Sequence, residues 1–287
     1  MAQKGEELKK LIIVGSSGFV GQSLKDYIKS KKTKFSRIIN FSRTEKKNII
    51  KLKKLPKADY IIYCINNKNI NKSLKYFFHF KKLLIKYSKK TKILFISSGA
   101  VYGPRSSNKK FKENEKLNFN RINKFKGYKK KYAKEKLLLE NEFKKIGMDG
   151  FKVSIARGFT FYGRYILKYN YVISQIINSM RSNKKIIINN QYTLRSYMHA
   201  DDMCRWIIKI IEVSSTKCPI YNVGSDKVFN IKNLAKFLAK KNNSKIIFKK
   251  NKLRKLDFYV PSTYLAKKKL KLKTTINFID AINSLIK

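Results

Sequence analysis

A tyrosine and a lysine four residues apart, Tyr132 and Lys136, could together exchange a proton with a hydroxyl group. If the segment is helical, this spacing places both side chains on one face. A lysine ammonium beside a phenol stabilises the phenolate and lowers the tyrosine pKa from about 10. A tyrosine tuned in this way acts as an acid and a base near neutral pH. The pair therefore predicts proton transfer at an alcohol or ketone oxygen.

A serine-containing segment supplies a second polar group for the same oxygen. The stretch SSGAVYG, residues 97–103, ends an apolar run that we interpret as a strand. Open parallel sheets bind ligands at the carboxyl ends of their strands. Two other tyrosines, Tyr27 and Tyr264, also precede a lysine by four residues, but only Tyr132 follows the serine-bearing strand in a helix with an apolar flank. The alternative is a surface tyrosine on a lysine-rich helix.

Three glycines between an apolar run and a helical pattern are typical of a phosphate-binding turn. In LIIVGSSGFVG, residues 11–21, Gly15, Gly18 and Gly21 follow four apolar residues. The first glycine permits the turn, the second lets backbone approach a pyrophosphate, and the third lets the helix pack closely on the strand. The helix N-terminus then offers N–H groups to the phosphates. The predicted dinucleotide-binding residues are Gly15, Ser17, Gly18, Phe19, Val20 and Gly21.

The end of the second predicted strand, RIINF at residues 37–41, bears on the choice of dinucleotide. An acidic residue there would hold the ribose hydroxyls of NAD, whereas an arginine accommodates the 2′-phosphate of NADP. Ser42 and Arg43 follow the strand, and the first acid is Glu45. We therefore expect NADP or NAD as cofactor, with Ser42 and Arg43 favouring NADP.

Apolar runs that alternate with helical patterns must position these residues. The rhythm predicts an α/β fold: a Rossmann-type doubly wound parallel sheet with a smaller C-terminal substrate-binding lobe. We expect residues 1–163 to form the NAD(P)-binding domain and residues 164–287 to form mainly the substrate lobe, interleaved with the first and without a linker. The expected strands are Leu11–Val14, Arg37–Phe41, Asp59–Ile65, Lys92–Ser97, Phe151–Ala156, Ile186–Ile188 and Ile220–Val223. The expected helices are Gln22–Lys31, Ile70–Ser88, Asn123–Lys145 with Leu137, Leu138 and Leu139 on its buried face, Ile173–Met180, Asp201–Ile211 and Ile231–Lys240.

The composition is strongly basic: 68 Lys and Arg residues against 17 Asp and Glu give a net charge of +51. Such a charge could serve nucleic acid or an anionic membrane surface. The lysines are spread along the whole chain without a nucleic-acid module, which favours compositional drift over a specific nucleic-acid partner. No apolar run approaches the roughly 20 residues of a membrane span, and no signal peptide is evident. Three scattered cysteines without metal-ligand spacing indicate reduced thiols, no metal, and a cytoplasmic protein.

Taken together, these motifs resemble the extended short-chain dehydrogenase/reductase family, in its nucleotide-sugar epimerase/dehydratase branch. The resemblance runs nearly end to end, and its motifs are specific jointly rather than singly. The matching stretches are GSSGFVG at 15–21, DYIIYCIN at 59–66, SSGAVYG at 97–103, Tyr132, Lys136 and Glu140 as YxxxKxxxE, ARGFTFYG at 156–163, RSYMHADD at 195–202, YNVGS at 221–225 and RKLD at 254–257.

The resemblance implies roles at the reacting end of the site. Ser98 would hydrogen-bond the reacting sugar oxygen, and Tyr132 would be the catalytic acid and base. Lys136 would tune the tyrosine and hold the nicotinamide ribose, and Ile65 would contact the cofactor.

The resemblance also implies residues that bind the substrate. Arg195 and Arg254 match positions that grip a diphosphate, where a guanidinium can donate two hydrogen bonds to phosphate. Tyr102 would lie by the sugar pocket, together with Thr160. We interpret His199 and Asp202 as structural, and Asp257 as serving the nucleotide ribose or the local structure.

Departures from the family pattern bear on the reaction. Family dehydratases carry an acidic pair directly after the serine or threonine, and here those positions are Gly99 and Ala100, so we expect no dehydration. The usual asparagine before the sugar pocket is Thr160. We expect reversible hydride transfer at a hexose carbon, C4, of a nucleotide-activated sugar in surface-glycan precursor synthesis. An NAD(P)-dependent epimerase and a 4-ketoreductase both fit.

A non-catalytic protein that reuses the fold is the alternative. An NADP-sensing or RNA-binding protein would give the basic charge a function, but it would not need Ser98, Tyr132 and Lys136. Besides a nucleotide-sugar substrate, we expect a second copy of the chain as partner. Members of the family often form dimers through paired helices, and residues 123–145 are the candidate face.

Overall fold

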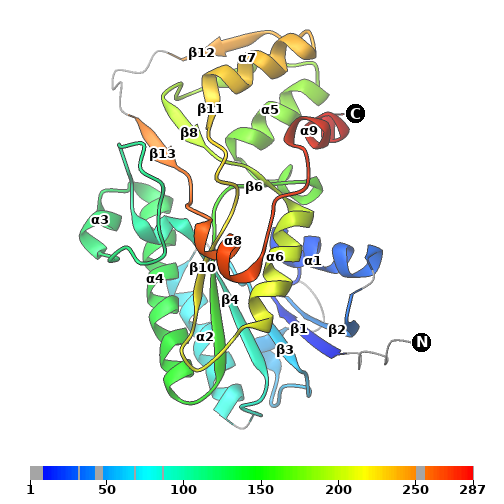
Figure 1. Cartoon of the computed structure of the whole chain (residues 1–287), viewed down its shortest axis with the longest axis vertical. Helices are drawn as coiled ribbons and strands as arrows, with labels where there is room; N and C mark the ends of the chain where they lie inside the picture. The colour runs from blue at the N-terminus through cyan, green and yellow to red at the C-terminus, as the bar shows by residue number, and fades with distance from the viewer. Residues whose placement is uncertain are drawn as a thin grey trace. The chain divides into compact units, whose positions relative to one another are not determined.

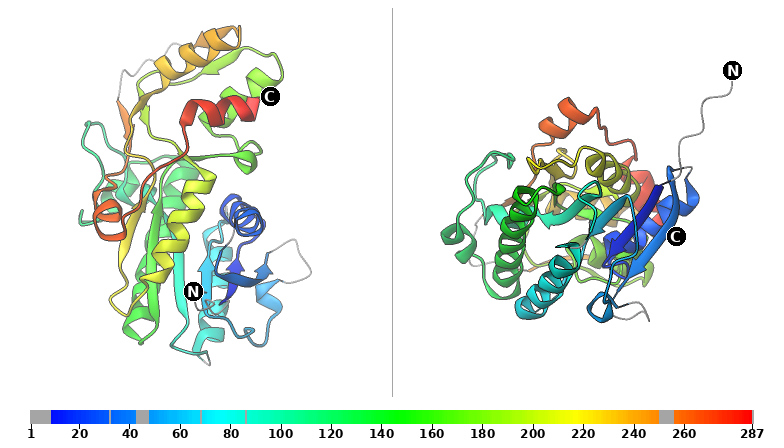
Figure 2. Two further views of the ribbon diagram at one scale, coloured as in Figure 1. Left: turned by 45° about the vertical axis from the view of Figure 1, so that its right-hand side comes forward. Right: turned by 90° about the horizontal axis from the view of Figure 1, so that it is seen from below.

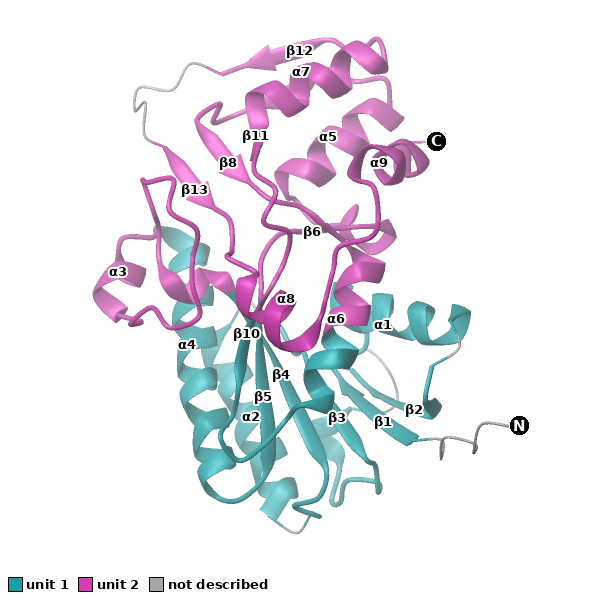
Figure 3. Ribbon diagram, viewed as in Figure 1, with its two compact units in different colours: residues 1–98, 126–157, 207–221 teal, residues 99–125, 158–206, 222–287 magenta. Residues whose placement is uncertain are grey.

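The computed structural model describes residues 9–31, 33–42, 48–67, 69–85, 87–249 and 256–286. The chain forms two compact units, each built from separate stretches of sequence (Figure 3). Where the sequence predicted interleaved lobes with a boundary after residue 163, the structure alternates between the units along the chain. Unit 1 comprises residues 1–98, 126–157 and 207–221, and unit 2 comprises residues 99–125, 158–206 and 222–287.

A six-stranded sheet forms the centre of unit 1 (Figure 1). Its strand order is β10-β5-β4-β3-β1-β2, and the pairs β1–β2, β1–β3 and β3–β4 are parallel. The order reverses direction at β1, as in a doubly wound α/β fold, which confirms the predicted fold class. The strands are β1 (Lys9–Val14), β2 (Phe35–Phe41), β3 (Tyr60–Tyr63), β4 (Lys92–Ser98), β5 (Lys152–Gly158) and β10 (Ile220–Val223).

Helices connect these strands. In two views, α2 and α4 lie side by side along the sheet (Figures 1 and 2), and the Lys81 ammonium of α2 contacts the Glu142 carboxylate of α4. The helices of this unit are α1 (Phe19–Ser30), the short 3-10 helix η1 (Ile49–Lys51), α2 (Ile70–Ile85) and α4 (Gly127–Met148).

An aromatic layer fills the space between α2, α4 and the sheet. The Tyr63 ring of β3 lies 5.0 Å from the ring of Phe80 and 5.4 Å from that of Phe143. Phe95 of β4 stacks on Phe143 with the ring centroids 4.5 Å apart. Such pairs stabilise a core beyond the area that they bury. They fix α4, the helix of the tyrosine–lysine pair, against the sheet.

Helix α4 differs from the sequence prediction at both ends. We expected Asn123–Lys145, but α4 covers Gly127–Met148, and a separate short helix, α3 (Phe119–Asn123), precedes it. The backbone is extended at Lys126, and Gly127 has a left-handed φ of 54°, so the chain leaves helical geometry between the two helices. Leu137 and Leu139 are buried as expected, whereas Leu138 is 37% exposed. Consecutive residues of a helix point about 100° apart, so three in a row do not share one face.

Unit 2 consists of small sheets and short helices. Strand β8 pairs with β11 and β13, β7 pairs with β12, and β6 pairs with β9. The strands are β6 (Phe161–Tyr162), β7 (Ile186–Ile188), β8 (Thr193–Arg195), β9 (Met198–His199), β11 (Phe229–Asn230), β12 (Ile246–Phe248) and β13 (Asp257–Tyr259). The helices are η2 (Gly99–Tyr102), α3, η3 (Arg164–Ile166), α5 (Val172–Arg181), α7 (Ile231–Lys241), α8 (Tyr264–Leu270) and α9 (Phe278–Ile286), and α6 (Ala200–Glu212) begins in this unit and ends in unit 1.

Strand β10 is the element whose place the sequence did not indicate. It follows the change of rhythm at residue 163, and we assigned it to the second lobe, yet it is the edge strand of the six-stranded sheet. Its register comes from backbone pairing with β5: the Ile155 N–H donates to the Pro219 carbonyl oxygen at 2.9 Å. Pairing of this kind leaves no local trace in sequence.

The described part of the chain contains no helix with the length and apolar character needed to cross a bilayer. Its three cysteines, Cys64, Cys204 and Cys218, are free thiols.

Candidate active site

The glycine turn after β1 gives each glycine a different steric role. Gly15 has φ of 105°, and a Cβ there would lie 2.8 Å from the Cys64 carbonyl carbon of the adjacent strand end. A Cβ on Gly21 would lie 2.6 Å from the Gly15 oxygen and from the Ser16 Cα. A Cβ on Gly18 would meet only the Gly15 oxygen, at 3.5 Å. Gly15 and Gly21 thus serve the fold, whereas the space above Gly18 stays open.

The N-terminus of α1 suits a negatively charged ligand. Gly18 at the N-cap provides no side-chain hydrogen bond, and no acidic residue lies in the first turn. The positive end of the helix dipole at this turn therefore favours an anion, as in other phosphate sites. Phe19 is buried, and Ser17 and Val20 are half-buried at this turn. The residues present fit the diphosphate of a dinucleotide.

Two further segments that are predicted to touch the cofactor follow β2 and β3, the strands on either side of β1. Ser42 follows β2 and is buried, and Ile65 follows β3 and is buried as well. Arg43 and Glu45, on which the preference for NADP depends, lie outside the described residues. The choice between NADP and NAD stays a prediction.

Lys136 is almost completely buried and held from three sides. Its Nζ donates a hydrogen bond to the Ile65 carbonyl oxygen at 2.9 Å. The same Nζ lies 5.3 Å from the Phe95 ring centroid and 5.7 Å from that of Tyr132. These contacts fix one ammonium between the segment after β3 and the tyrosine on its own helix. The predicted tyrosine–lysine pair is therefore adjacent in space.

Burial dominates the electrostatics around Lys136. Loss of solvation lowers the pKa of Lys136, and the negative charges of Glu135, Cys64 as thiolate and Glu140 oppose that shift. Burial raises the pKa of Cys64 to about 12, so this thiol is protonated near neutral pH. Burial also raises the pKa of Glu135, and the positive charge of Lys136 opposes this rise.

A second tyrosine stacks on the candidate acid and base. Tyr128 lies one helical turn before Tyr132, with ring centroids 5.9 Å apart and ring planes 25° from parallel. Burial raises the pKa of Tyr128, the Glu135 charge adds to this, and a hydrogen bond with Asn66 opposes it. The stack restricts the orientation of the Tyr132 ring, and sequence reasoning missed it.

A buried ionic network supports the serine end of the site. Ser98 is the last residue of β4 and is buried. The hydroxyl of Ser97, beside it, donates to Glu140 Oε1 at 2.6 Å, and Arg157 Nη2 at the end of β5 donates to Glu140 Oε2 at 2.8 Å. The network ties β4, β5 and α4 together. In the sequence Glu140 and Arg157 stand in the motifs YxxxKxxxE and ARGFTFYG. A buried charge requires a partner, but the sequence does not show that these two residues pair.

The candidate residues of unit 1 thus gather at one edge of the sheet. The glycine turn follows β1, Ser42 follows β2, Ile65 follows β3 and Ser98 ends β4. The pairs β1–β2, β1–β3 and β3–β4 are parallel, so these strand ends lie at the same edge. The hydrogen bond from Lys136 to Ile65 brings α4 to that edge. This is where open α/β sheets bind dinucleotides.

The other predicted residues belong to unit 2, and two of them serve its interior. Tyr102 is buried, its hydroxyl donates to Asn222 Oδ1 at 2.8 Å, and its ring stacks on Phe111. Thr160 is half-buried, and its carbonyl oxygen accepts a hydrogen bond from the Met198 N–H at 3.1 Å. Both residues shape the unit through these contacts, and their proposed contacts with a sugar stay predictions.

His199 and Asp202 make local structural contacts. His199 Nδ1 accepts the Asp201 N–H at 3.2 Å at the start of α6, and burial lowers the histidine pKa against the charges of Asp201 and Asp202. Asp202 is buried and accepts three hydrogen bonds from Thr275 and Ile276. These contacts anchor residues 275–276 to α6, which agrees with the structural interpretation of both side chains.

Arg195 lies on β8 beside an acidic partner. Its guanidinium forms an ion pair with the Asp257 carboxylate and donates to the Asp257 carbonyl oxygen at 2.8 Å. A cation held in this way keeps a defined orientation. Arg254, the second predicted arginine, lies outside the described residues.

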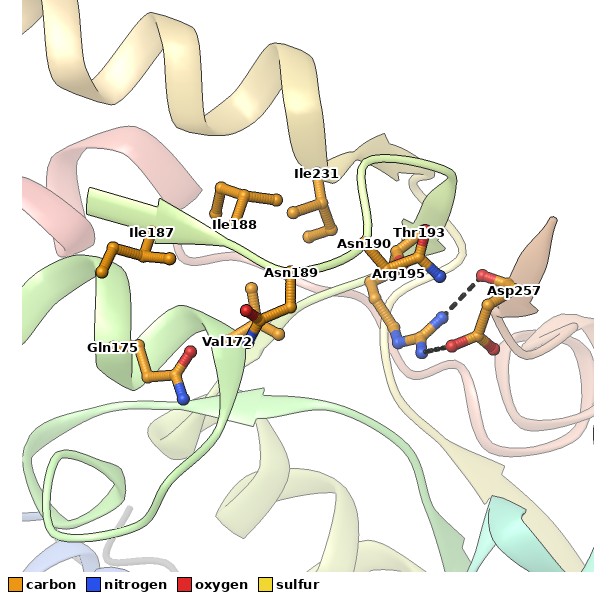
Figure 4. A pocket seen from close by; sticks show the side chains of 10 residues that line it. All are labelled: Val172, Gln175, Ile187, Ile188, Asn189, Asn190, Thr193, Arg195, Ile231 and Asp257. Atoms are coloured by element: carbon orange, nitrogen blue, oxygen red, sulfur yellow. Dashed lines mark hydrogen bonds and ion pairs between the residues drawn. The ribbon is translucent and has the colours of Figure 1, made fainter. Parts of the chain in front are cut away.

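A cavity of about 180 Å³ lies within unit 2 against Arg195 (Figure 4). The view shows apolar side chains of α5, β7 and α7 on one side, and the guanidinium with its aspartate at one end. Amide side chains from the segment between β7 and β8 add hydrogen-bonding groups, which the sequence signalled only as a polar run before Arg195. The lining residues are Val172, Gln175, Ile187, Ile188, Asn189, Asn190, Thr193, Arg195, Ile231 and Asp257. A mixed lining of this kind suits a small organic anion.

The sequence matches the family model described as NAD dependent epimerase/dehydratase family over residues 11–224. The chain belongs to this family. Membership in this epimerase/dehydratase family supports binding of an NAD-type dinucleotide, for which the glycine turn after β1 is the candidate place. Among the described residues, no group of three or more His, Cys, Asp or Glu side chains could hold a metal ion.

Several solved structures share the fold of this family member over nearly the whole chain. RMD from Pseudomonas aeruginosa, complexed with NADPH, is 18% identical, with a TM-score of 0.80 over 99% of this chain and 98% of that chain. The UDP-N-acetylglucosamine 4-epimerase of Methanobrevibacter ruminantium is 18% identical, with a TM-score of 0.77 over 97% of each chain. The dTDP-glucose 4,6-dehydratase of Bacillus anthracis, in complex with NAD, is 15% identical, with a TM-score of 0.75 over 96% of this chain and 95% of that chain.

At these identities the likeness establishes the fold and not the reaction. A comparison with curated protein sequences gave no match.

Proposed function

We propose that this family member transfers hydride between a nicotinamide dinucleotide and C4 of a hexose carried on a nucleotide. The observation that carries the proposal is the Tyr132–Lys136 pair. The lysine Nζ lies 5.7 Å from the centroid of the tyrosine ring and donates a hydrogen bond to the Ile65 carbonyl oxygen. Ser98 at the end of β4 belongs to the same sheet edge. A protein that only binds dinucleotide has no need of this set.

The proposed roles follow from the chemistry of each group. NADP or NAD, when bound, supplies or accepts the hydride. Tyr132 donates or accepts the proton of the reacting oxygen, and Ser98 orients that oxygen with its hydroxyl. Lys136 keeps a positive charge beside the phenol, which stabilises the phenolate form of Tyr132. The uncapped N-terminus of α1 and Gly18 hold the diphosphate of the dinucleotide.

The substrate class rests on the cavity in unit 2. Arg195 presents a guanidinium suited to a phosphate, and amides and apolar side chains line the rest of the cavity. One structure of the same fold is a UDP-N-acetylglucosamine 4-epimerase in complex with UDP-N-acetylmuramic acid. We therefore propose a nucleotide-activated sugar as substrate, with the diphosphate at Arg195 and Arg254, and a place in the synthesis of surface glycans.

The surroundings of Gly99 argue against water elimination. A Cβ on Gly99 would lie 2.5 Å from the Phe159 ring. The centroid of this ring lies 4.7 Å from that of Tyr259, and its Cγ would lie 3.7 Å from a Cβ on Gly224. An acidic side chain at position 99 would require this ring to move. A chain without that acid can oxidise or reduce a sugar carbon but lacks the group that family dehydratases use to expel water.

Analysis of released nucleotide and assays of turnover test the proposal. The purified protein would be denatured and any released nucleotide identified by chromatography, and NADPH and NADH oxidation would be followed with 4-keto and 4-hydroxy nucleotide sugars. Retained NAD with interconversion of C4 epimers would indicate an epimerase. No retained nucleotide, together with NADPH-dependent reduction, would indicate the 4-ketoreductase that Arg43 favours. The absence of both dinucleotide binding and sugar turnover would overturn the proposal.

We also propose that the protein forms a homodimer through the paired helices of unit 1. Phe78 and Ile85 of α2 and Leu138 of α4 are exposed apolar side chains. Light scattering after size-exclusion chromatography would give about twice the chain mass, and Phe78→Lys would reduce it. A monomeric mass for the unmodified protein would contradict this proposal.

A further inference from the structure

Four charged side chains are buried together in unit 1. Lys136, Arg157, Glu135 and Glu140 are each at most 2% exposed, and they are the buried charged residues among the described part of this unit. Two carry a positive charge and two a negative charge. Three of them lie on α4 and the fourth lies at the end of β5. The group is therefore neutral as a whole when all four are ionised.

One positive and one negative member already form a pair. Arg157 binds Glu140 through two of its nitrogens, with Nη2 2.8 Å and Nε 3.0 Å from carboxylate oxygens. This bidentate contact satisfies both side chains. Lys136 and Glu135 remain, adjacent in sequence and without such an ion pair between them.

Lys136 needs a compensating charge because its contacts are all neutral. Its hydrogen bond goes to the Ile65 carbonyl oxygen, and its other close neighbours are the rings of Phe95 and Tyr132. Taking an ammonium out of water without an opposite charge is costly, and the usual result is loss of its proton. A neutral lysine would not stabilise a phenolate.

Glu135 lies on the neighbouring side of α4, above the aromatic layer. Its charge acts on Tyr63 of β3, and Ser73 of α2 lies nearby. The Glu135 Oε1, the Ser73 Oγ and the Tyr63 hydroxyl are buried, and none of them makes a hydrogen bond to the described residues. The mechanism described above does not use this carboxylate. Packing alone does not explain a glutamate here, because a glutamine or a leucine would fill the same space without burying a carboxylate oxygen that lacks a hydrogen-bond partner.

We propose that Glu135 is the counter-charge of Lys136 and a positioning residue for the Tyr132–Lys136 pair, holding the lysine in its ammonium form. The charge pairing stands on burial and charge balance, whereas its catalytic consequence rests on the proposed function. The electrostatics agree with this role. Among the groups whose charge raises the pKa of Lys136, Glu135 has the largest effect, ahead of Cys64 and Glu140. The other titratable groups around the two side chains are Tyr63, Tyr76, Tyr128, Tyr132 and Arg157.

A double-mutant cycle in urea tests the pairing without sugar or cofactor. The variants are Glu135→Gln, Lys136→Met and the double variant, compared with Glu142→Gln, which removes a half-buried carboxylate of α4 that pairs with Lys81 and Lys145 instead. We expect each single variant to lower the urea midpoint and the double variant to recover a large part of the loss, because it buries no unpaired charge. Additive effects of the two changes would overturn the proposal.

The pH dependence of NADPH affinity supplies a readout that a purely structural role would not change. Titrations followed by nucleotide fluorescence would compare the parent with Glu135→Gln and Glu135→Asp. Without its counter-charge Lys136 should lose its proton at lower pH. The pH at which NADPH affinity has fallen about tenfold should therefore be about one unit lower in Glu135→Gln than in the parent. Glu135→Asp should restore the parent curve, and Lys136→Met should bind weakly at all pH values.

Curves of the parent and Glu135→Gln that superimpose would overturn the proposal. If the parent itself binds neither NADPH nor NAD, the proposed function fails, and the urea cycle still decides whether Glu135 and Lys136 form a charge pair.

Discussion

Arg157 and Glu140 form a buried ion pair, with Nη2 and Oε2 2.8 Å apart, at the point where β5 meets α4. The Ser97 hydroxyl binds the same carboxylate, so this pair fixes the strand end that carries Ser98 relative to the helix that carries Lys136. The pair therefore links the two elements that carry the candidate catalytic groups.

Removal of one member of this pair should destabilise the protein strongly. Glu140→Gln leaves the Arg157 guanidinium buried without its counter-charge, so we expect a loss of about 3–5 kcal/mol in the free energy of unfolding. Urea denaturation followed by circular dichroism measures it. The double variant Arg157→Met/Glu140→Leu should lose less than either single variant, because it buries no unpaired charge. If the double variant lost as much as the two single variants combined, the ion pair would not be the cause.

Tyr132→Phe should abolish most of the turnover and leave the fold intact. The change removes only the hydroxyl that exchanges the proton, so we expect kcat to fall about 10²–10⁴-fold with little change in NADPH affinity. Tyr128→Phe is the matched control, because it keeps the ring that stacks on Tyr132. Steady-state kinetics on the active nucleotide sugar give the result. Turnover near that of the parent in Tyr132→Phe would assign the acid and base to another group.

Two glycines of the same turn should respond differently to alanine. Gly21→Ala places a Cβ 2.6 Å from backbone atoms, so it should lower stability, whereas Gly18→Ala meets only one atom, at 3.5 Å. Gly18→Ala should fold normally but bind NADPH at least about tenfold more weakly, because its methyl group occupies the space for the diphosphate. Urea midpoints and fluorescence titration separate the two effects. Unchanged NADPH affinity in Gly18→Ala would place the diphosphate elsewhere.

The ion pair of Glu212 should make part of the stability depend on pH. Burial alone would raise the pKa of Glu212, but hydrogen bonds from Lys34 and Lys209 outweigh it and lower the pKa. A lowered carboxyl pKa gives stability that is present above the unfolded value of about 4.3 and is lost as the pH falls through the folded value. Glu212→Gln should therefore cost about 1 kcal/mol near neutral pH, less than a fully buried pair would, because the pair is partly exposed to solvent.

The difference between Glu212→Gln and its parent should disappear in acid. Urea midpoints of the two proteins, measured at a series of pH values from about pH 7 downward through the carboxyl titration, give this difference. A loss of equal size throughout the series would show that the carboxylate acts through packing rather than charge.

The sequence predicted those features of the site that depend on neighbours along the chain. The glycine turn, Ser98 and the Tyr132–Lys136 pair each follow a strand or share a helix face, so local spacing was enough to find them. The parallel pairing of β1, β2, β3 and β4 followed from the alternation of apolar runs and helical patterns.

The contacts that support these residues join distant positions and were not predicted. Lys136 binds Ile65, 71 residues earlier in the chain. Glu140 and Arg157 belong to the motifs YxxxKxxxE and ARGFTFYG, but a sequence pattern does not say which partner each charge finds. The place of β10 was missed for the same reason, since hydrogen bonds with β5 determine it.

The alternation of the two units along the chain constrains how this protein can be made and recombined. Unit 1 receives its last stretch at residues 207–221, after two passages of the chain through unit 2. A ribosome must therefore synthesise 223 of the 287 residues before the central sheet has its final strand. Neither unit can be released by cutting the chain at one position, and exchanging unit 2 with that of a relative would require replacing three separate segments together.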